Sequence, residues 1–292
     1  MNIVASRMAR IQPFKVMEVQ RRAHELERAG RGVVHMEIGQ PDFGAPPAVA
    51  AAAKRAVDER TLGYTDALGL PELRAALADF YRSHLGAEVP AERIVATAGA
   101  SGALLLALGA AANPGDEILM ADPGYPCYSN FALLLGAVPV RMPVDAAQAW
   151  QPTLEDLRRH WSPRTRGIIL ASPSNPAGTL IDPAALDEMA GWVRARGGFV
   201  VLDEIYQGLV YGERPASRLA GRDGVFIINS FSKYFCMTGW RLGWAVVPDA
   251  LHGAVEKLAQ NIFICPSAPA QYAALAAFGP DNLAVLETRR EE

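Results

Sequence analysis

The sequence contains few cysteines, and their spacing indicates neither a metal site nor disulfide bonds. Its 292 residues include three cysteines, Cys127, Cys236 and Cys265, at wide spacing. An odd number at this spacing excludes a regular disulfide framework and the paired cysteines of a zinc site. We therefore expect free thiols and a location in the reducing cytoplasm.

Several chemical signatures are also missing. The five histidines form no HExxH pattern, so a zinc hydrolase has little support and no metal site is expected. The chain has neither the GK[ST] of a Walker loop nor the GxGxxG of a dinucleotide-binding fold. Lys and Arg number 28 against 31 Asp and Glu, a net charge of −3, which argues against a nucleic-acid partner.

No hydrophobic run is long enough to cross a membrane. The most apolar stretch, residues 100–112, is too short and indicates a buried helix, so no membrane partner is expected. The start of the chain lacks the apolar core and cleavage site of a secretory signal. With 50% hydrophobic and 20% charged residues, the composition is that of a globular protein and excludes disorder.

Seven short apolar runs recur along the chain, separated by helical patterns. Most lack polar alternation, which is typical of strands covered on both faces. They predict strands over residues 93–97, 117–121, 138–142, 167–171, 199–203, 225–229 and 243–247. Helices are predicted over residues 47–60, 71–85, 102–112, 153–160, 183–196 and 249–262. The predicted fold class is α/β, with a mostly parallel central sheet and helices on both faces.

The composition shifts only near the start. There a strand-like run, VVHMEIG at residues 33–39, leads into a loop over residues 40–47. This shift predicts an N-terminal arm over residues 1–45 and a main domain over residues 46–292. At the far end, LETRREE stops inside a helical pattern with no capping residue or glycine, so we expect the chain to be cut there.

Two motifs follow strands with small or turn-forming residues. RIVATAGASGAL predicts a strand ending at Thr97 and a helix starting near Ser101, whose free N–H groups can bind an anion such as phosphate. ASPSNPAGT, at residues 171–179, follows a buried strand and carries Asn175. Taken alone, the first motif is better explained by tight packing and the second by an ordinary turn.

Two further motifs place charged groups just after buried strands. In FVVLDEIYQGL, Asp203 and Glu204 end the most apolar strand, and Tyr206 follows. A carboxylate there needs a cation, a metal or a cationic heterocycle, unless it caps the next element. In NSFSKYFCMTGWRLGW, Lys233 lies among apolar and aromatic groups, which favours an amine that forms a Schiff base. Taken alone, Lys233 is better explained as a solvated surface lysine.

The conjunction of these motifs points to one cofactor. An anion-binding turn, an acid, a hydroxyl, an amide, an amine and an arginine each lie at or just after a strand end. Pyridoxal phosphate requires an amine for its aldehyde, a cradle for its phosphate, a carboxylate for its ring nitrogen and donors for its phenolic oxygen. The sequence therefore predicts a protein that binds pyridoxal phosphate.

The same motifs resemble those of a known family. SNPAGT, DEIYQGL and SFSKYFCMTGWRLGW, in this order, are similar to motifs of the class I/II aminotransferases, which are fold-type I pyridoxal-phosphate enzymes. The resemblance extends from about Met8 to the end of the chain. Cys236 stands where relatives usually have glycine. The resemblance implies an aspartate-aminotransferase-like large domain and an incomplete small domain, to which the arm over residues 1–45 would belong.

The resemblance also implies roles for single residues around the cofactor ring. Lys233 would form the Schiff base and later move a proton. Asp203 would keep the ring nitrogen protonated. Asn175 and Tyr206 would hydrogen-bond the phenolic oxygen, and Tyr125 would stack on the ring.

A second implied group of residues would bind the cofactor's phosphate. The backbone N–H groups of Ala100 and Ser101 would donate to it, as would the hydroxyls of Ser101 and Ser230. Arg241 would contribute a permanent charge and two donors at once.

The remaining implied residues concern substrate and assembly. The backbone of Gly39 would lie beside the substrate carboxylate, and Asn175 would also bind the substrate. Tyr64 would reach a phosphate across a dimer interface, which implies a homodimer. In the family a C-terminal domain supplies an arginine that clamps this carboxylate, and here nothing follows Glu292. We therefore expect slow transamination and weak protection of the first forty or so residues.

The function expected from these observations is amino-group transfer from an L-amino acid to a 2-oxo acid by ping-pong exchange. Three alternatives stay open. One is a lyase or synthase of the same fold, such as a C–S lyase or an aminocyclopropane-carboxylate synthase. Another is a non-catalytic binding module, which the lack of a helix-turn-helix segment and of basic charge disfavours. The third is a truncated protein that binds the cofactor with little activity.

Overall fold

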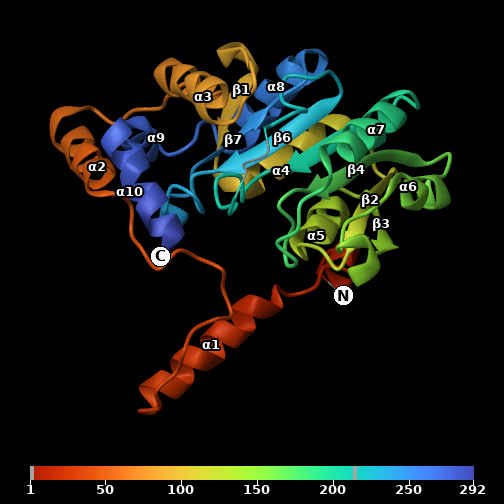
Figure 1. The fold of residues 1–292 in the computed structure, drawn as a ribbon, viewed down its shortest axis with the longest axis horizontal. Helices are drawn as coiled ribbons and strands as arrows, with labels where there is room; N and C mark the ends of the chain where they lie inside the picture. Colours follow the sequence, from red (N-terminus) through yellow and green to blue (C-terminus); the bar gives the residue numbers. More distant parts are fainter. Residues whose placement is uncertain (1–2, 213–215) are drawn as a thin grey trace.

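A seven-stranded sheet forms the centre of the molecule. In the computed structural model, which describes residues 3–212 and 216–292, the strand order is β1-β7-β6-β5-β4-β2-β3 (Figure 1). Neighbouring strands run parallel, except that β7 is antiparallel to both β1 and β6. The predicted α/β fold with a mostly parallel sheet is confirmed.

All seven predicted strands form. They are β1 (Ile94–Thr97), β2 (Glu117–Asp122), β3 (Val138–Pro143), β4 (Thr165–Ala171), β5 (Phe199–Asp203), β6 (Val225–Ser230) and β7 (Gly243–Val246). The helices are α1 (Lys15–Arg28), α2 (Pro47–Glu59), α3 (Pro71–His84), α4 (Gly99–Ala111), α5 (Cys127–Leu134), α6 (Leu154–His160), α7 (Pro183–Arg194), α8 (His252–Ile262), α9 (Ala268–Ala274) and α10 (Pro280–Glu291).

Successive side chains of each strand point to opposite faces of the sheet and fill two separate cores. In β6, Ile227 packs in a core shared with α3 and α7, whereas Ile228 packs in a core shared with α4 and α8. Both side chains are fully buried. Because helices cover both faces, the strands need no polar side, and this explains the unbroken apolar runs in the sequence.

The helix boundaries follow local signals where these exist. Pro71 and Pro183 begin α3 and α7, and the Asp182 carboxylate accepts hydrogen bonds from the first N–H groups of α7. The sequence did not predict α1, α5 or α9. The last two have only eight and seven residues and carry little amphipathic pattern. None of the helices within residues 3–212 and 216–292 combines the length and apolarity that a membrane crossing requires.

The strand expected over residues 33–39 does not form, and this expectation is corrected. A strand needs a neighbour to satisfy its backbone N–H and C=O groups. Here the segment runs back beside α1, which projects away from the sheet (Figure 1), and it pairs with no strand. Val34 and Met36 are 84% and 86% exposed, so the alternating apolar residues of VVHMEIG pack on no core.

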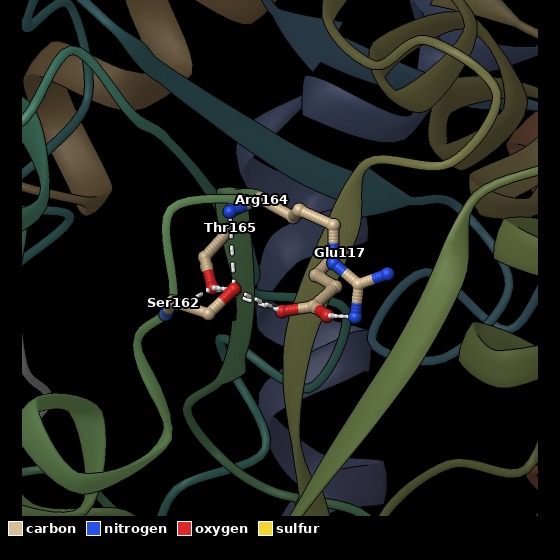
Figure 2. Close-up of polar contacts among 4 residues, drawn as sticks. All are labelled: Glu117, Ser162, Arg164 and Thr165. Carbon is tan, nitrogen blue, oxygen red and sulfur yellow. Dashed lines mark hydrogen bonds and ion pairs between the residues drawn. The ribbon is translucent and has the colours of Figure 1, made fainter.

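A buried acid joins the beginnings of two strands at the edge opposite the strand ends. Figure 2 shows Glu117 of β2 facing Ser162, Arg164 and Thr165, which lie just before or at the start of β4. The Ser162 hydroxyl donates to Glu117 Oε2 at 2.6 Å, and the Arg164 guanidinium hydrogen-bonds Oε1. The Ser162 hydrogen bond and the Arg164 charge hold the pKa of Glu117 below its usual range.

We expect Glu117→Gln to lower the free energy of unfolding by about 1–3 kcal/mol, because charge-assisted hydrogen bonds are lost at a buried position. Urea unfolding followed by circular dichroism measures this loss. Glu155→Gln is the matched control: its ion pair with Arg158 is exposed and should contribute no more than about 0.5 kcal/mol. The Glu117 contribution should disappear as the pH falls, because its pKa is depressed in the folded state. Equal losses in both variants would contradict this role.

Candidate active site

A cavity of about 820 Å³ lies at the edge of the sheet where β4, β5 and β6 end. The strand register places Ala171 beside Asp203, and Asp203 beside Ile228. Ligands of open α/β sheets bind outside the carboxyl ends of the strands. The fold therefore brings together the residues that follow three different strands in the sequence.

Nine of the eleven predicted site residues line this cavity: Gly39, Ala100, Ser101, Tyr125, Asn175, Asp203, Tyr206, Lys233 and Arg241. Ser230 and Tyr64 do not. Ser230 is buried at the end of β6, and its hydroxyl donates to Ser232 Oγ at 2.9 Å. Ser232 lies on the cavity wall in its place. Tyr64 follows α2 and is 81% exposed, away from the cavity of its own chain.

Asp203 provides a buried carboxylate at the end of β5. Only 4% of the residue is exposed. Tyr128 Oη donates to its Oδ2 at 2.6 Å, and the N–H of Ile205 donates to its Oδ1 at 3.0 Å. Burial raises the pKa of Asp203, and these two donors offset part of that effect. A cation in the cavity would favour the ionised form, because it compensates for desolvation.

Arg241 lies against the start of α4, where two glycines allow a close approach. Gly99 has a φ of +70°, and a Cβ there would lie 2.6 Å from Arg241 Nη2. A Cβ on Gly243 would lie 2.9 Å from the backbone N of Ala100. Arg241 Nη1 donates to the carbonyl of Thr238 at 3.0 Å, which steadies the guanidinium. Helix N–H groups and a guanidinium together form an anion site.

Lys233 follows β6 and extends toward the N-terminal segment. Its Nζ donates to the carbonyl of Gly39 at 2.5 Å and lies 5.8 Å from the centre of the Tyr206 ring. Burial lowers the pKa of Lys233, and the nearby Arg241 charge lowers it further. A lysine that loses its proton more readily is a better amine nucleophile.

Asn175 and Tyr206 form a pair of polar groups on the cavity wall. Asn175 Nδ2 donates to Tyr206 Oη at 3.2 Å, although the two residues follow different strands. Tyr125 packs edge-on against Tyr128, with ring centres 5.3 Å apart, and against Phe14 at 5.9 Å. These contacts pack Tyr125 between two other aromatic rings on the cavity wall.

Sequence reasoning missed several residues of this site. Tyr128 went unnoticed because the short helix α5, which carries it, was not predicted. Tyr128 lies three residues after Tyr125. In a helix this spacing would place both side chains on the same face, and this is the signal that could have identified Tyr128. Gly99 and Gly243 matter only through their backbone approach to Arg241 and α4, which no local pattern reveals.

The comparisons with known proteins decide the family. The sequence model of "Aminotransferase class I and II" matches residues 31–292. The chain belongs to this family. The resemblance seen in the motifs is thereby confirmed, and this aminotransferase is an enzyme that moves an amino group between an amino acid and a 2-oxo acid.

Individual members of the family are similar to this chain in both sequence and structure. Valine–pyruvate aminotransferase of Mycobacterium tuberculosis is 44% identical over 94% of this chain and 71% of its own. A (5-formylfuran-3-yl)methyl phosphate transaminase of Methanocaldococcus jannaschii is 36% identical over 94% of this chain and 72% of its own. The crystal structure of aspartate aminotransferase from Thermus thermophilus with maleate is 31% identical, with a TM-score of 0.94 over all of this chain and 77% of its own.

A second buried acid, Glu204, lies next to Asp203 but does not line the cavity. It is 3% exposed, and its Oε2 accepts a hydrogen bond from Ser217 Oγ at 2.6 Å. Burial raises the pKa of Glu204 to about 8, and the Asp203 charge adds to this effect. Glu204 is therefore mostly protonated at neutral pH.

This raised pKa predicts how stability depends on pH. A group whose pKa is higher in the folded state stabilises the fold fully below its ordinary pKa, here 4.5, and loses that contribution as the pH rises toward about 8. We expect the unfolding free energy of the wild type to fall relative to that of Glu204→Gln, by up to about 1.4 kcal/mol per pH unit. Urea unfolding of both proteins across this range measures the difference. A difference that stays constant with pH would refute the assignment.

Proposed function

We propose that this aminotransferase uses pyridoxal phosphate, bound with its phosphate at the start of α4 and its ring nitrogen at Asp203. The observation that supports this proposal most strongly is the placement of charged groups around the cavity. Among the described residues, the cations on the wall are Lys233 and Arg241, and Arg241 lies at α4. The buried acid Asp203 lies at the end of β5. A molecule with an anionic phosphate and a cationic ring nitrogen matches both ends.

When bound, this cofactor supplies an aldehyde for amines and an electron sink for charge that develops at the substrate's Cα. Lys233 presents the amine and moves a proton at that Cα, for which its lowered pKa suits it. Asp203 holds a proton at the ring nitrogen. Asn175 and Tyr206, already joined by a hydrogen bond, orient the phenolic oxygen, and Tyr125 covers the ring.

The phosphate would accept hydrogen bonds from the backbone N–H groups of Ala100 and Ser101, from the Ser101 hydroxyl and from Arg241. Gly99 leaves room for the guanidinium beside these groups. Ser230 stays a predicted ligand, and its hydroxyl donates to that of Ser232, which lies on the cavity wall.

Substrate and assembly form the finer part of this proposal. An L-amino acid or a 2-oxo acid would lie between Lys233, Asn175 and Gly39, whose carbonyl the lysine already contacts. We propose a homodimer in which the exposed Tyr64 reaches the phosphate of the partner's site. The arm over residues 1–45 would act as part of a small domain and residues 46–292 as the cofactor domain. The three free thiols support a cytoplasmic location.

The experiment that tests the function is a single-turnover reaction with a panel of amino acids and no 2-oxo acid acceptor. Aminotransfer should yield one 2-oxo acid per site without ammonia and then stop until an acceptor is added. Continuous ammonia release without an acceptor would instead indicate a lyase of the same fold and would overturn the proposal.

We predict that Lys233→Ala abolishes this half-reaction, whereas Lys257→Ala, an exposed lysine on α8, leaves it unchanged. Borohydride reduction followed by peptide mapping should place the cofactor on Lys233 alone, because Lys233 is the lysine that lines the cavity among residues 3–212 and 216–292. A label on Lys257, Lys54 or Lys15 would refute the assignment.

A further inference from the structure

Two histidines, His24 and His35, meet where the segment after α1 runs back beside that helix. His24 and Glu27 are three residues apart on α1 and therefore share one face. The segment that returns beside α1 brings His35 against this face, and the two imidazole centres are 5.3 Å apart. His35 Nε2 lies 2.9 Å from Glu27 Oε1, and His35 Nδ1 lies 2.8 Å from Glu37 Oε1.

We propose that His24, Glu27 and His35 bind a divalent transition-metal ion. One ligand atom from each residue lies within 4.8 Å of the other two. Ligands about 2.1 Å from a tetrahedral zinc ion stand about 3.4 Å apart, so the atoms need to close by about 1.4 Å at most. All three residues are exposed, and rotation of their side chains is enough for this movement.

The donor set decides the class of ion. Two imidazole nitrogens and one carboxylate oxygen suit Zn²⁺, Cu²⁺ and Ni²⁺, whereas Mg²⁺ and Ca²⁺ take oxygen ligands. Three protein ligands leave the remaining positions to water. The site therefore belongs to the open, surface-accessible kind rather than to the closed structural kind.

Glu37 completes the arrangement without touching the ion. Metal-binding histidines commonly donate their second N–H to a carboxylate, which fixes the ring and its tautomer. Glu37 accepts from His35 Nδ1, and Nε2 faces Glu27 Oε1, where an ion would displace the proton that Nε2 shares with this carboxylate. The Glu37 side chain is 11% exposed, against 40% for Glu27. Glu37 is therefore the more buried of the two carboxylates.

A surface ion-pair cluster is the simpler explanation, and it accounts for only part of the geometry. It explains His35 between two carboxylates. It does not explain the position of His24, whose ring centre lies 5.3 Å from that of His35 although His24 takes part in neither of these two ion pairs. An ion shared by both rings accounts for His24 and His35 together.

The site would join α1 to the segment that leads into the active site. Residues 36–40 line the cavity, and the Gly39 carbonyl contacts Lys233. An ion that links His35 to α1 would restrict this segment beside the lysine. The binding site itself does not depend on the proposed cofactor.

The test is a titration of the tag-free protein, as isolated, with Zn²⁺ in a calorimeter. We expect one saturable site per chain and at least about a tenfold loss of affinity in His24→Gln, Glu27→Gln and His35→Gln. Glu37→Gln should weaken binding by about tenfold through the orientation of His35. His84→Gln, an exposed histidine on α3, is the matched control and should bind as the wild type does.

Electron paramagnetic resonance with Cu²⁺ as the probe supplies an independent readout, since it reports the number of bound nitrogens. Two nitrogens are expected in the wild type and in His84→Gln, and one in His24→Gln and in His35→Gln. The proposal is overturned if the wild type shows no saturable binding, if binding persists unchanged in His24→Gln or His35→Gln, or if the copper signal is the same in the wild type and these variants. Circular dichroism confirms that each variant is folded.

Discussion

The desolvated carboxylate of Asp203 is the constraint on which the candidate active site depends. It lies where β5 ends inside the protein, and burial raises its pKa. Tyr128 and the N–H of Ile205 fix its two oxygens but carry no positive charge. Only a cation in the cavity can fully offset the cost of keeping this group ionised. The site is thus prepared for a ligand with a positive charge at one defined point.

The start of α4 imposes the opposite requirement on the same cavity. The first N–H groups of α4 and the guanidinium of Arg241 converge there, and Gly99 and Gly243 allow the backbone to approach closely enough. Lys233, on the wall of the same cavity, is destabilised as a cation by burial and by Arg241. Acid, amine and anion site therefore support one another, and each would be unfavourable or inert by itself.

The sequence predicted those features that depend on strand ends. The apolar runs set the seven strands, and a parallel sheet necessarily brings the ends of β4, β5 and β6 together, so Asn175, Asp203 and Lys233 were recognisable in advance. The sequence did not predict the features that depend on packing between distant segments. VVHMEIG has the alternation of a strand but finds no neighbouring strand.

Other gaps have equally specific causes. Tyr128 lies on the unpredicted helix α5. The position of Ser232 on the cavity wall, with Ser230 hydrogen-bonded to it, depends on how the chain turns after β6. The approach of His24 to His35 depends on the path of the chain after α1, which no motif spacing specifies.

The most direct measurement of the central claim is the protonation state of the cofactor's ring nitrogen, followed by nuclear magnetic resonance with pyridoxal phosphate labelled with ¹⁵N in its ring. The account predicts that this nitrogen is protonated at every pH at which the wild type stays folded. It should lose its proton as the pH rises in Asp203→Asn but keep it in Glu204→Gln. An unprotonated nitrogen in the wild type, or loss of the proton in Glu204→Gln to the same degree as in Asp203→Asn, would contradict the role given to Asp203.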